Sequence, residues 1–198
     1  PDLFVELGDV RLAVYQHGNP LNPTVILVHG YPDNHEVWDG VVAQLQNDFH
    51  VVTYDVRGSG ASSAPKRIRD YSLARLSADL QAIMNAVSPG KPVHLVAHDW
   101  GSIQTWESVT DPALQSRIAS YTTISGPCLD HVGKLLRRYI SQPTPEHLRY
   151  VINQAIHSWY IFLFQAPLLF SLSPGFFHLP PECFPFRLSQ WLFTFGLP

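Results

Sequence analysis

The sequence predicts an α/β fold in which helices cover a mostly parallel sheet. Short apolar runs alternate along the chain with amphipathic segments of helical period, which is typical of strands joined by helical crossovers. The run at residues 24–28 is apolar without alternation, as expected for a strand buried on both faces of a parallel sheet. Parallel neighbours need right-handed crossovers, so we expect the connecting helices to pack against the sheet.

The elements follow from these patterns in order. We predict strands at residues 4–7, 10–16, 24–28, 50–55, 93–97 and 118–124, the first two forming a hairpin around Gly8-Asp9. We predict helices at residues 35–46, 72–87 and 102–110. The second of these is the clearest, because Ser72 can act as its N-cap and apolar side chains share one face: Leu73, Leu76, Leu80, Ile83, Met84 and Val87.

The composition indicates a soluble protein. The 198 residues are 45% hydrophobic and 15% charged, with a formal net charge of -3, and a chain of this size can bury a sizeable core. The negative balance and the lack of a long basic run give no electrostatic basis for nucleic-acid binding. Cys128 and Cys183 have no metal-ligand spacing, so we expect two reduced cysteines, with Cys128 buried. No secretory signal precedes the first strand, and we expect a cytoplasmic protein.

The character of the chain changes after Pro127. Residues 150–198 carry only two formal charges, those of Glu182 and Arg187, and are rich in aromatic residues and prolines. A membrane-spanning helix needs about 20 apolar residues, and Gln165-Ala166-Pro167 interrupts the best candidate. Two interpretations remain, a core of short helices or a cap over an apolar site, and we favour the cap. We therefore predict a core domain at residues 1–127 and an incomplete helical cap at residues 128–198.

A carboxylate stands at the sharp turn where the strand at residues 93–97 leads into a helix. In His98-Asp99-Trp100-Gly101, Asp99 occupies the tip of a nucleophile elbow, where a serine is usual. A serine that displaced a group from saturated carbon would form an ether, which water does not readily cleave. An aspartate forms an ester instead, and water can hydrolyse it. Asp99 therefore favours epoxide opening or halide displacement over ester or peptide cleavage.

Four motifs in one order resemble the epoxide hydrolase and haloalkane dehalogenase branch of the α/β-hydrolase superfamily. They are His29-Gly30-Tyr31-Pro32, the segment from Asp55 to Ser62, His98-Asp99-Trp100-Gly101, and Ser158-Trp159-Tyr160 with Phe164-Gln165-Ala166-Pro167. The resemblance implies an α/β-hydrolase core and a helical cap. The chain is also similar, more loosely, to bacterial proteins in which such a domain is fused to a short-chain dehydrogenase. The expected partners are therefore a fused dehydrogenase domain or a second copy of the chain in a homodimer.

The resemblance also assigns roles. Asp99 would be the nucleophile, and the backbone amides of Tyr31 and Trp100 would form the oxyanion hole, with a cis bond before Pro32. Tyr160 would be the cap acid that donates its phenol to the epoxide oxygen, although core packing is the alternative for this residue. We expect no cofactor and no metal. The substrate would be a small apolar epoxide, with water as the second reactant.

Several residues receive structural roles instead. Asp55 and Arg57 lie in a glycine-rich segment that lacks the lysine of a phosphate-binding loop. The resemblance makes this segment a structural turn after the fourth strand, in which Asp55 and Arg57 would tie neighbouring loops. His98 adjoins the nucleophile in sequence and is expected to point away from it.

The catalytic base is the gap in this assignment. The family's catalytic histidine and usually its partner acid follow two further core strands after the cap, and we recognise none of these within the 198 residues, so we expect those C-terminal strands to be missing. A second cap tyrosine is also unassigned. Two alternatives to an epoxide hydrolase stay open: a haloalkane dehalogenase, which shares Asp99 and Trp100, and a non-catalytic binding protein on the same fold.

Overall fold

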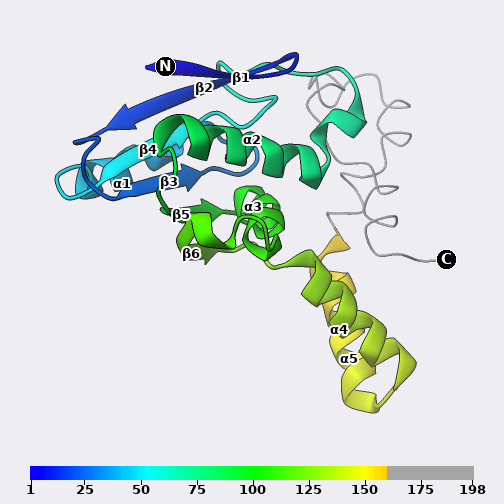
Figure 1. Ribbon diagram of the computed structural model, residues 1–198. Coiled ribbons are helices and arrows are strands. Elements are labelled where there is room, and N and C mark those ends of the chain that lie inside the picture. Colours follow the sequence, from blue (N-terminus) through cyan, green and yellow to red (C-terminus); the bar gives the residue numbers. More distant parts are fainter. Residues whose placement is uncertain (160–198) are drawn as a thin grey trace. The chain divides into compact units, whose positions relative to one another are not determined.

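The computed structural model describes residues 1–159, and the chain divides into two units, Pro1–Pro127 and Cys128–Pro198. The first unit holds a six-stranded sheet in the order β1-β2-β4-β3-β5-β6 (Figure 1). Its strands are β1 (Leu3–Leu7), β2 (Val10–His17), β3 (Thr24–Val28), β4 (His50–Tyr54), β5 (Val93–His98) and β6 (Ile118–Ile124). β1, β2 and β4 pair antiparallel, whereas β4, β3, β5 and β6 are parallel. The predicted α/β fold with a mostly parallel sheet is confirmed.

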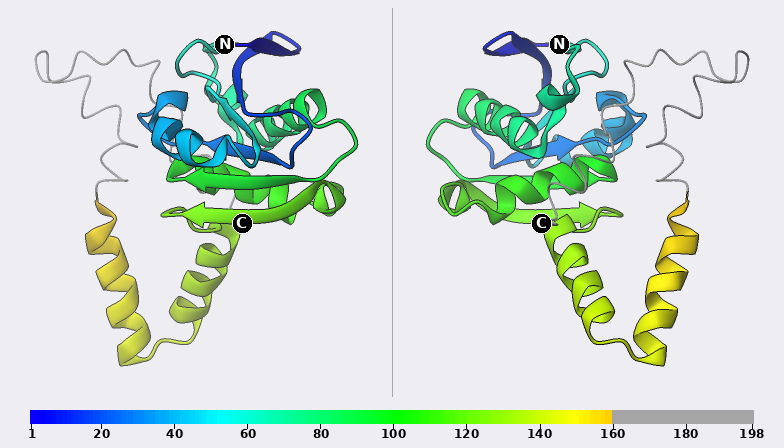
Figure 2. Two further views of the ribbon diagram at one scale, coloured as in Figure 1. Left: turned by 90° about the vertical axis from the view of Figure 1, so that its left-hand side faces the viewer. Right: turned by 90° about the vertical axis from the view of Figure 1, so that its right-hand side faces the viewer.

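Helices cover both faces of this sheet. They are α1 (Asp39–Leu45), α2 (Leu73–Val87) and α3 (Trp100–Thr110), with the 3₁₀ turns η1 (His35–Trp38), η2 (Ile68–Tyr71) and η3 (Gln115–Arg117). Successive side chains of a strand point to opposite faces, and the two faces of β3 bury different partners. One apolar cluster contains Val25, Leu27, Trp38, Val42 and Val51. The other includes Ile26, Val28, Leu80, Ile83 and Met84. α1 therefore lies on one face and α2 on the other, with α3 beside α2 (Figure 2).

Two helix starts differ from the sequence prediction, and one predicted N-cap lacks its hydrogen bond. The expected helix at residues 35–46 is a 3₁₀ turn followed by α1, because the Asn34 side chain accepts the Glu36 amide at 2.9 Å and tightens the first turn. Helix α3 begins at Trp100, two residues earlier than expected, since Asp99 is already its N-cap. Ser72 occupies the N-cap position of α2, but its side chain makes no capping hydrogen bond.

The second unit contains two helices among the described residues, α4 (Leu129–Ser141) and α5 (Pro145–His157). Thr144 caps α5 by accepting the His147 amide at 3.1 Å, and the His147 ring stacks on Tyr139 with centroids 4.1 Å apart. Helix α5 exposes apolar side chains, including Leu148 and Ile156.

Several predictions about this part of the chain are not tested. The assignment of this unit as a cap stays a prediction. The expected absence of the C-terminal core strands lies outside the described residues. No helix in residues 1–159 has the length and apolar character needed to cross a bilayer.

Candidate active site

Asp99 adopts a backbone conformation that L-residues rarely take. Its φ is 54° and its ψ is −127°, at the corner between β5 and α3. Such strain persists only where the surrounding structure holds it, and it concentrates at functional sites. Here the Asp99 amide donates to the Ile124 carbonyl of β6 at 2.9 Å, and the Ile103 amide donates to the Asp99 carbonyl at 3.2 Å. The corner is therefore fixed to both the sheet and the helix, with a half-buried carboxylate at its tip.

Three glycines allow the chain to pack closely around this corner. A Cβ on Gly101 would lie well inside 3.0 Å of the Val28 and His29 carbonyl oxygens. A Cβ on Gly30 would lie 2.5 Å from Asp99 Oδ1, and one on Gly126 would lie 2.5 Å from the Asp99 carbonyl oxygen. Real Cβ atoms essentially never approach that closely. The glycines thus let the loop after β3, the start of α3 and the segment after β6 meet at Asp99.

The backbone amide of Tyr31 points at the Asp99 carboxylate. Its N–H donates to Asp99 Oδ1 at 3.1 Å. The Tyr31–Pro32 bond is cis, as predicted. β3 and β5 are adjacent parallel strands, so their carboxyl ends bring these two loops together, the usual place for a ligand site in a sheet of this kind. Among residues 1–159, Asp99 forms no ion pair and its Oδ2 accepts no hydrogen bond.

The roles predicted for Trp100, Tyr160 and His98 stay predictions. Trp100 is the half-buried first residue of α3, next to Asp99, and its role in the oxyanion hole stays a prediction. Tyr160 lies outside the described residues. The structural role expected for His98, which is half-buried at the end of β5, also stays a prediction. Cys128 is buried, as predicted.

Asp55 ties the segment after β3 to the loop after β4, which confirms its structural role. Its fully buried carboxylate accepts the His35 amide at 3.0 Å, the His35 ring at 2.7 Å and the Ala61 amide at 2.8 Å. The Tyr15 hydroxyl adds a longer bond of 3.3 Å. Burial alone would raise the pKa of Asp55, but the hydrogen bonds from Ala61 and His35 together hold its pKa below the usual value.

Arg57 is likewise structural. It forms a buried ion pair with Asp79 of α2 and donates to the backbone carbonyls of Asp70 and Arg75. Burial raises the pKa of Asp79 even though the adjacent guanidinium opposes the shift. The side chains of Asp55 and Arg57 therefore hold the glycine-rich segment after β4, as the resemblance implied.

The sequence reasoning missed the contacts of His29 and His35. His29 is 3% exposed and contacts both the loop after β3 and the loop after β4. The sequence signal that could have pointed to His29 is its position directly before Gly30 and Tyr31 in the first motif. No pattern in the sequence pointed to the pairing of His35 with Asp55, which are 20 residues apart.

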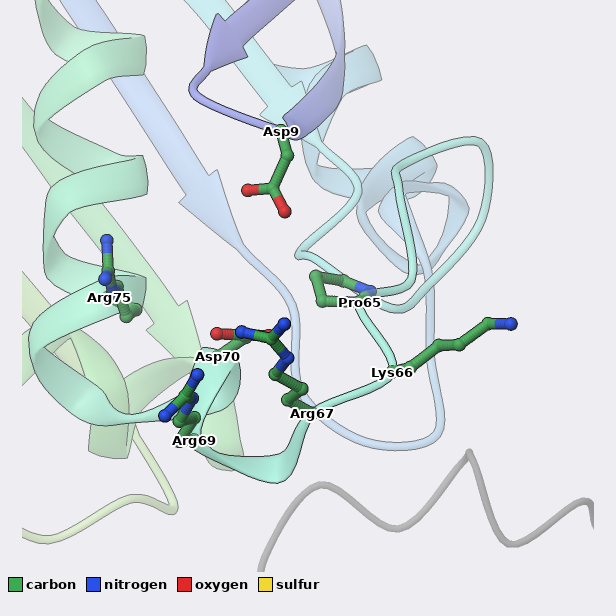
Figure 3. Close-up of a pocket in the computed structure, with 7 residues that line it drawn as sticks. All are labelled: Asp9, Pro65, Lys66, Arg67, Arg69, Asp70 and Arg75. Atoms are coloured by element: carbon green, nitrogen blue, oxygen red, sulfur yellow. The ribbon is translucent and has the colours of Figure 1, made fainter.

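A separate cavity of about 580 Å³ lies beside the start of α2. Its lining is mostly cationic (Figure 3) and consists of Asp9, Pro65, Lys66, Arg67, Arg69, Asp70 and Arg75. Figure 3 shows the Lys66 side chain extending away from the other lining residues. None of the seven belongs to the corner at Asp99, so this cavity is not part of the candidate active site.

Comparison with known proteins decides the family. The family model described as alpha/beta hydrolase fold matches residues 23–177. The chain belongs to the α/β-hydrolase family. Its similarity is to the epoxide-hydrolase-like branch: it is 45% identical over 161 residues to "Probable oxidoreductase EphD" of Mycobacterium tuberculosis, covering 81% of this chain and 27% of that protein. It is 37% identical over 128 residues to "Epoxide hydrolase A" of the same organism, covering 64% of this chain and 38% of the relative.

Solved structures agree with this placement of the α/β-hydrolase chain. The crystal structure of an epoxide hydrolase from Vigna radiata matches with a TM-score of 0.57 and 31% identity, covering 63% of this chain and 38% of that one. A Bacillus megaterium epoxide hydrolase matches with a TM-score of 0.67 at 23% identity, which shows the shared fold. The chain spans 27% and 38% of the two curated relatives.

Proposed function

We propose that this chain carries the nucleophile and part of the oxyanion hole of an epoxide hydrolase, which converts a lipophilic epoxide to a vicinal diol. The observation that carries the proposal is the Asp99 carboxylate at a strained corner, with Oδ1 held by the Tyr31 amide at 3.1 Å. Relatives named epoxide hydrolases, in the family to which the chain belongs, support the same chemistry.

In the first step, Asp99 is alkylated. Oδ2, which accepts no hydrogen bond among the described residues, attacks the less hindered epoxide carbon while Oδ1 stays on the Tyr31 amide. A new carbon–oxygen bond forms as the ring carbon–oxygen bond breaks. The departing oxygen takes its proton from an acid, for which the sequence offers Tyr160, since an alkoxide is a poor leaving group without one. The product of this step is a hydroxyalkyl ester of Asp99.

In the second step, water hydrolyses that ester. A histidine base, which we do not recognise in this chain, takes a proton from water as it attacks the Asp99 carboxyl carbon. Negative charge then develops on Oδ1, which already faces the Tyr31 amide, and the Trp100 amide would supply a second donor. Removing one such donor costs about 3 kcal/mol in comparable enzymes. Cleavage of the acyl–oxygen bond releases the diol and leaves one water oxygen in the carboxylate.

The direct test replaces Asp99 with alanine in the whole protein and follows diol formation from styrene oxide. We expect Asp99→Ala to abolish turnover, whereas the control Asp48→Ala, which removes an exposed carboxylate after α1, should leave it unchanged. Diol formation by Asp99→Ala at the parent rate would refute the mechanism. Chloride release from haloalkanes without diol formation would favour a dehalogenase, and binding without either reaction would favour a non-catalytic role.

The whole protein is also proposed to include a short-chain dehydrogenase domain. The support is the name of its relative, "Probable oxidoreductase EphD", of which this chain covers 27%. Reading the coding sequence beyond both ends tests the idea. A glycine-rich dinucleotide fingerprint between a strand and a helix would support it, and a continuous sequence without one would contradict it.

A further inference from the structure

The ring of His29 is held between two backbone groups that together fix its proton. Nδ1 lies 2.8 Å from the Gly30 carbonyl oxygen, and Nε2 lies 3.0 Å from the Val56 amide nitrogen. A carbonyl oxygen can only accept a hydrogen bond and an amide N–H can only donate one. Both bonds form together only in the neutral ring with its proton on Nδ1. Burial lowers the pKa of His29, which agrees with a neutral ring.

The alternative tautomer is disfavoured by the same contacts. Ser59 Oγ lies 3.1 Å from Nε2 and gives its own proton to the Val56 carbonyl at 2.7 Å. Ser59 Oγ could therefore accept a hydrogen bond from a protonated Nε2. The Val56 N–H would then face another donor, and the Gly30 carbonyl would lose its hydrogen bond from the His29 ring. The Val56 amide, which belongs to the loop after β4, thus keeps the proton on Nδ1.

The Gly30 carbonyl and the Tyr31 amide belong to one trans peptide group, so they point in opposite directions. The carbonyl is held by His29 Nδ1 at 2.8 Å and by the Asp33 amide at 3.1 Å. With the carbonyl held on that side, the Tyr31 N–H is aimed at Asp99 Oδ1. Rotation of this peptide plane would remove the donor from the nucleophile without moving any side chain of the site.

We propose that His29 is a positioning residue that sets the direction of the Tyr31 oxyanion donor through the Gly30–Tyr31 peptide plane. The inference rests on the proposed function, because the donor matters only if Asp99 forms an ester. It adds a connection from the loop after β4, through the tautomer of one buried ring, to the nucleophile.

Two substitutions separate the two bonds of the ring. In His29→Asn, the side-chain amide nitrogen can take the place of Nδ1 and keep the bond to Gly30. In His29→Gln, the side-chain oxygen can take the place of Nε2 and keep the bond from Val56. We expect the Gln variant to hydrolyse the Asp99 ester roughly tenfold to a hundredfold more slowly, a partial loss of one oxyanion donor. The Asn variant should stay within about threefold of the parent rate. KM should change little in either variant, because the hydrogen bonds of His29 go to Gly30, Val56 and Ser59 and not to Asp99.

The two variants should rank in the opposite order in stability. The Asn variant leaves the partly buried Val56 N–H without its ring partner, whereas the Gln variant leaves a Gly30 carbonyl that still accepts from Asp33. We therefore expect Asn to lower the midpoint of urea unfolding at least as much as Gln. A merely structural histidine would make ester hydrolysis and stability fall together.

The measurements are ester formation and decay at Asp99 by mass spectrometry after mixing with styrene oxide, urea unfolding, and nitrogen NMR of the His29 ring. Protonated Nδ1 and bare Nε2 are expected in the parent spectrum. The opposite tautomer, equal hydrolysis rates in both variants, or rates that follow stability would overturn the proposal. A parent protein that forms no Asp99 ester would instead refute the proposed function, so the two failures are distinguishable.

Discussion

Replacing Gly101 with alanine tests whether the close contact between α3 and the end of β3 holds the nucleophile in place. Gly101 is a buried residue in the first turn of α3, and its backbone is helical. An alanine Cβ would meet the carbonyl oxygens of Val28 and His29 inside 3.0 Å. Both obstacles are backbone atoms, which cannot rotate away as a flexible side chain can. The start of the helix must therefore retreat from the strand.

The expected cost follows from two opposing terms. Ordinary van der Waals contact begins at 3.4 Å, so the start of the helix must retreat by about 1 Å. Overpacking of this kind costs about 1–3 kcal/mol. Because the obstacles are backbone, we take the upper end, about 3 kcal/mol. Alanine gains about 1 kcal/mol over glycine in a helix. The net loss in the free energy of unfolding is then about 2 kcal/mol. The same shift moves Asp99 relative to the Tyr31 amide, so ester hydrolysis should slow about tenfold or more.

Gly40→Ala is the matched control. Gly40 lies in α1, and a Cβ there would meet nothing within 4 Å. The same substitution should therefore stabilise the protein by about 0.5–1 kcal/mol and leave turnover unchanged. Urea unfolding and styrene oxide hydrolysis give both readouts. A Gly101→Ala protein as stable and as active as Gly40→Ala would refute the reasoning.

Three further predictions concern the interior and the oxyanion donor. Asp79→Asn should lower the free energy of unfolding by about 3–5 kcal/mol, because it leaves the buried Arg57 guanidinium unpaired; a loss under about 1 kcal/mol in urea unfolding would contradict this. Burial lowers the pKa of His29 and of His50. Their neutral forms contribute stability in full above the unfolded pKa, about 6.5, and that contribution is lost as pH falls from there through the lower folded pKa. Replacing both with asparagine should flatten the dependence of unfolding free energy on pH below about 6.5, and an unchanged slope would count against it. Tyr31→Phe should keep diol formation within about twofold, because the donor is a backbone amide; a much larger loss would assign a role to the phenol.

The fold was largely predictable because its strands are strongly apolar. The fully buried strands β3 and β4 allow little alternative to a central parallel position. What the sequence did not predict depends on local hydrogen bonds. The 3₁₀ turn at His35 follows from the Asn34 cap, and α3 starts at Trp100 because Asp99 adopts a positive φ. Periodicity reports which face is buried but not where the first turn begins.

The candidate site was predictable only in part, for a similar reason. Asp99 and Tyr31 lie in motifs that are recognisable in the sequence. In the structure the Tyr31 amide nitrogen lies 3.1 Å from Asp99 Oδ1. The residues that hold Asp99 and Tyr31 in place could not be predicted from such motifs. Gly126 packs against the Asp99 backbone from a segment 27 positions away, and the tautomer of His29 depends on Val56. Such contacts depend on how loops meet in space, which no single sequence pattern records.

Oxygen labelling tests the role of Asp99 most directly. The whole protein is mixed in molar excess with styrene oxide in ¹⁸O-water for a single turnover, and the diol and the peptide containing Asp99 are analysed by mass spectrometry. Ester hydrolysis at the carboxyl carbon predicts an unlabelled diol and one ¹⁸O in Asp99. A labelled diol with an unlabelled Asp99 peptide would mean that water attacks the epoxide itself, and the nucleophilic role of Asp99 would be wrong.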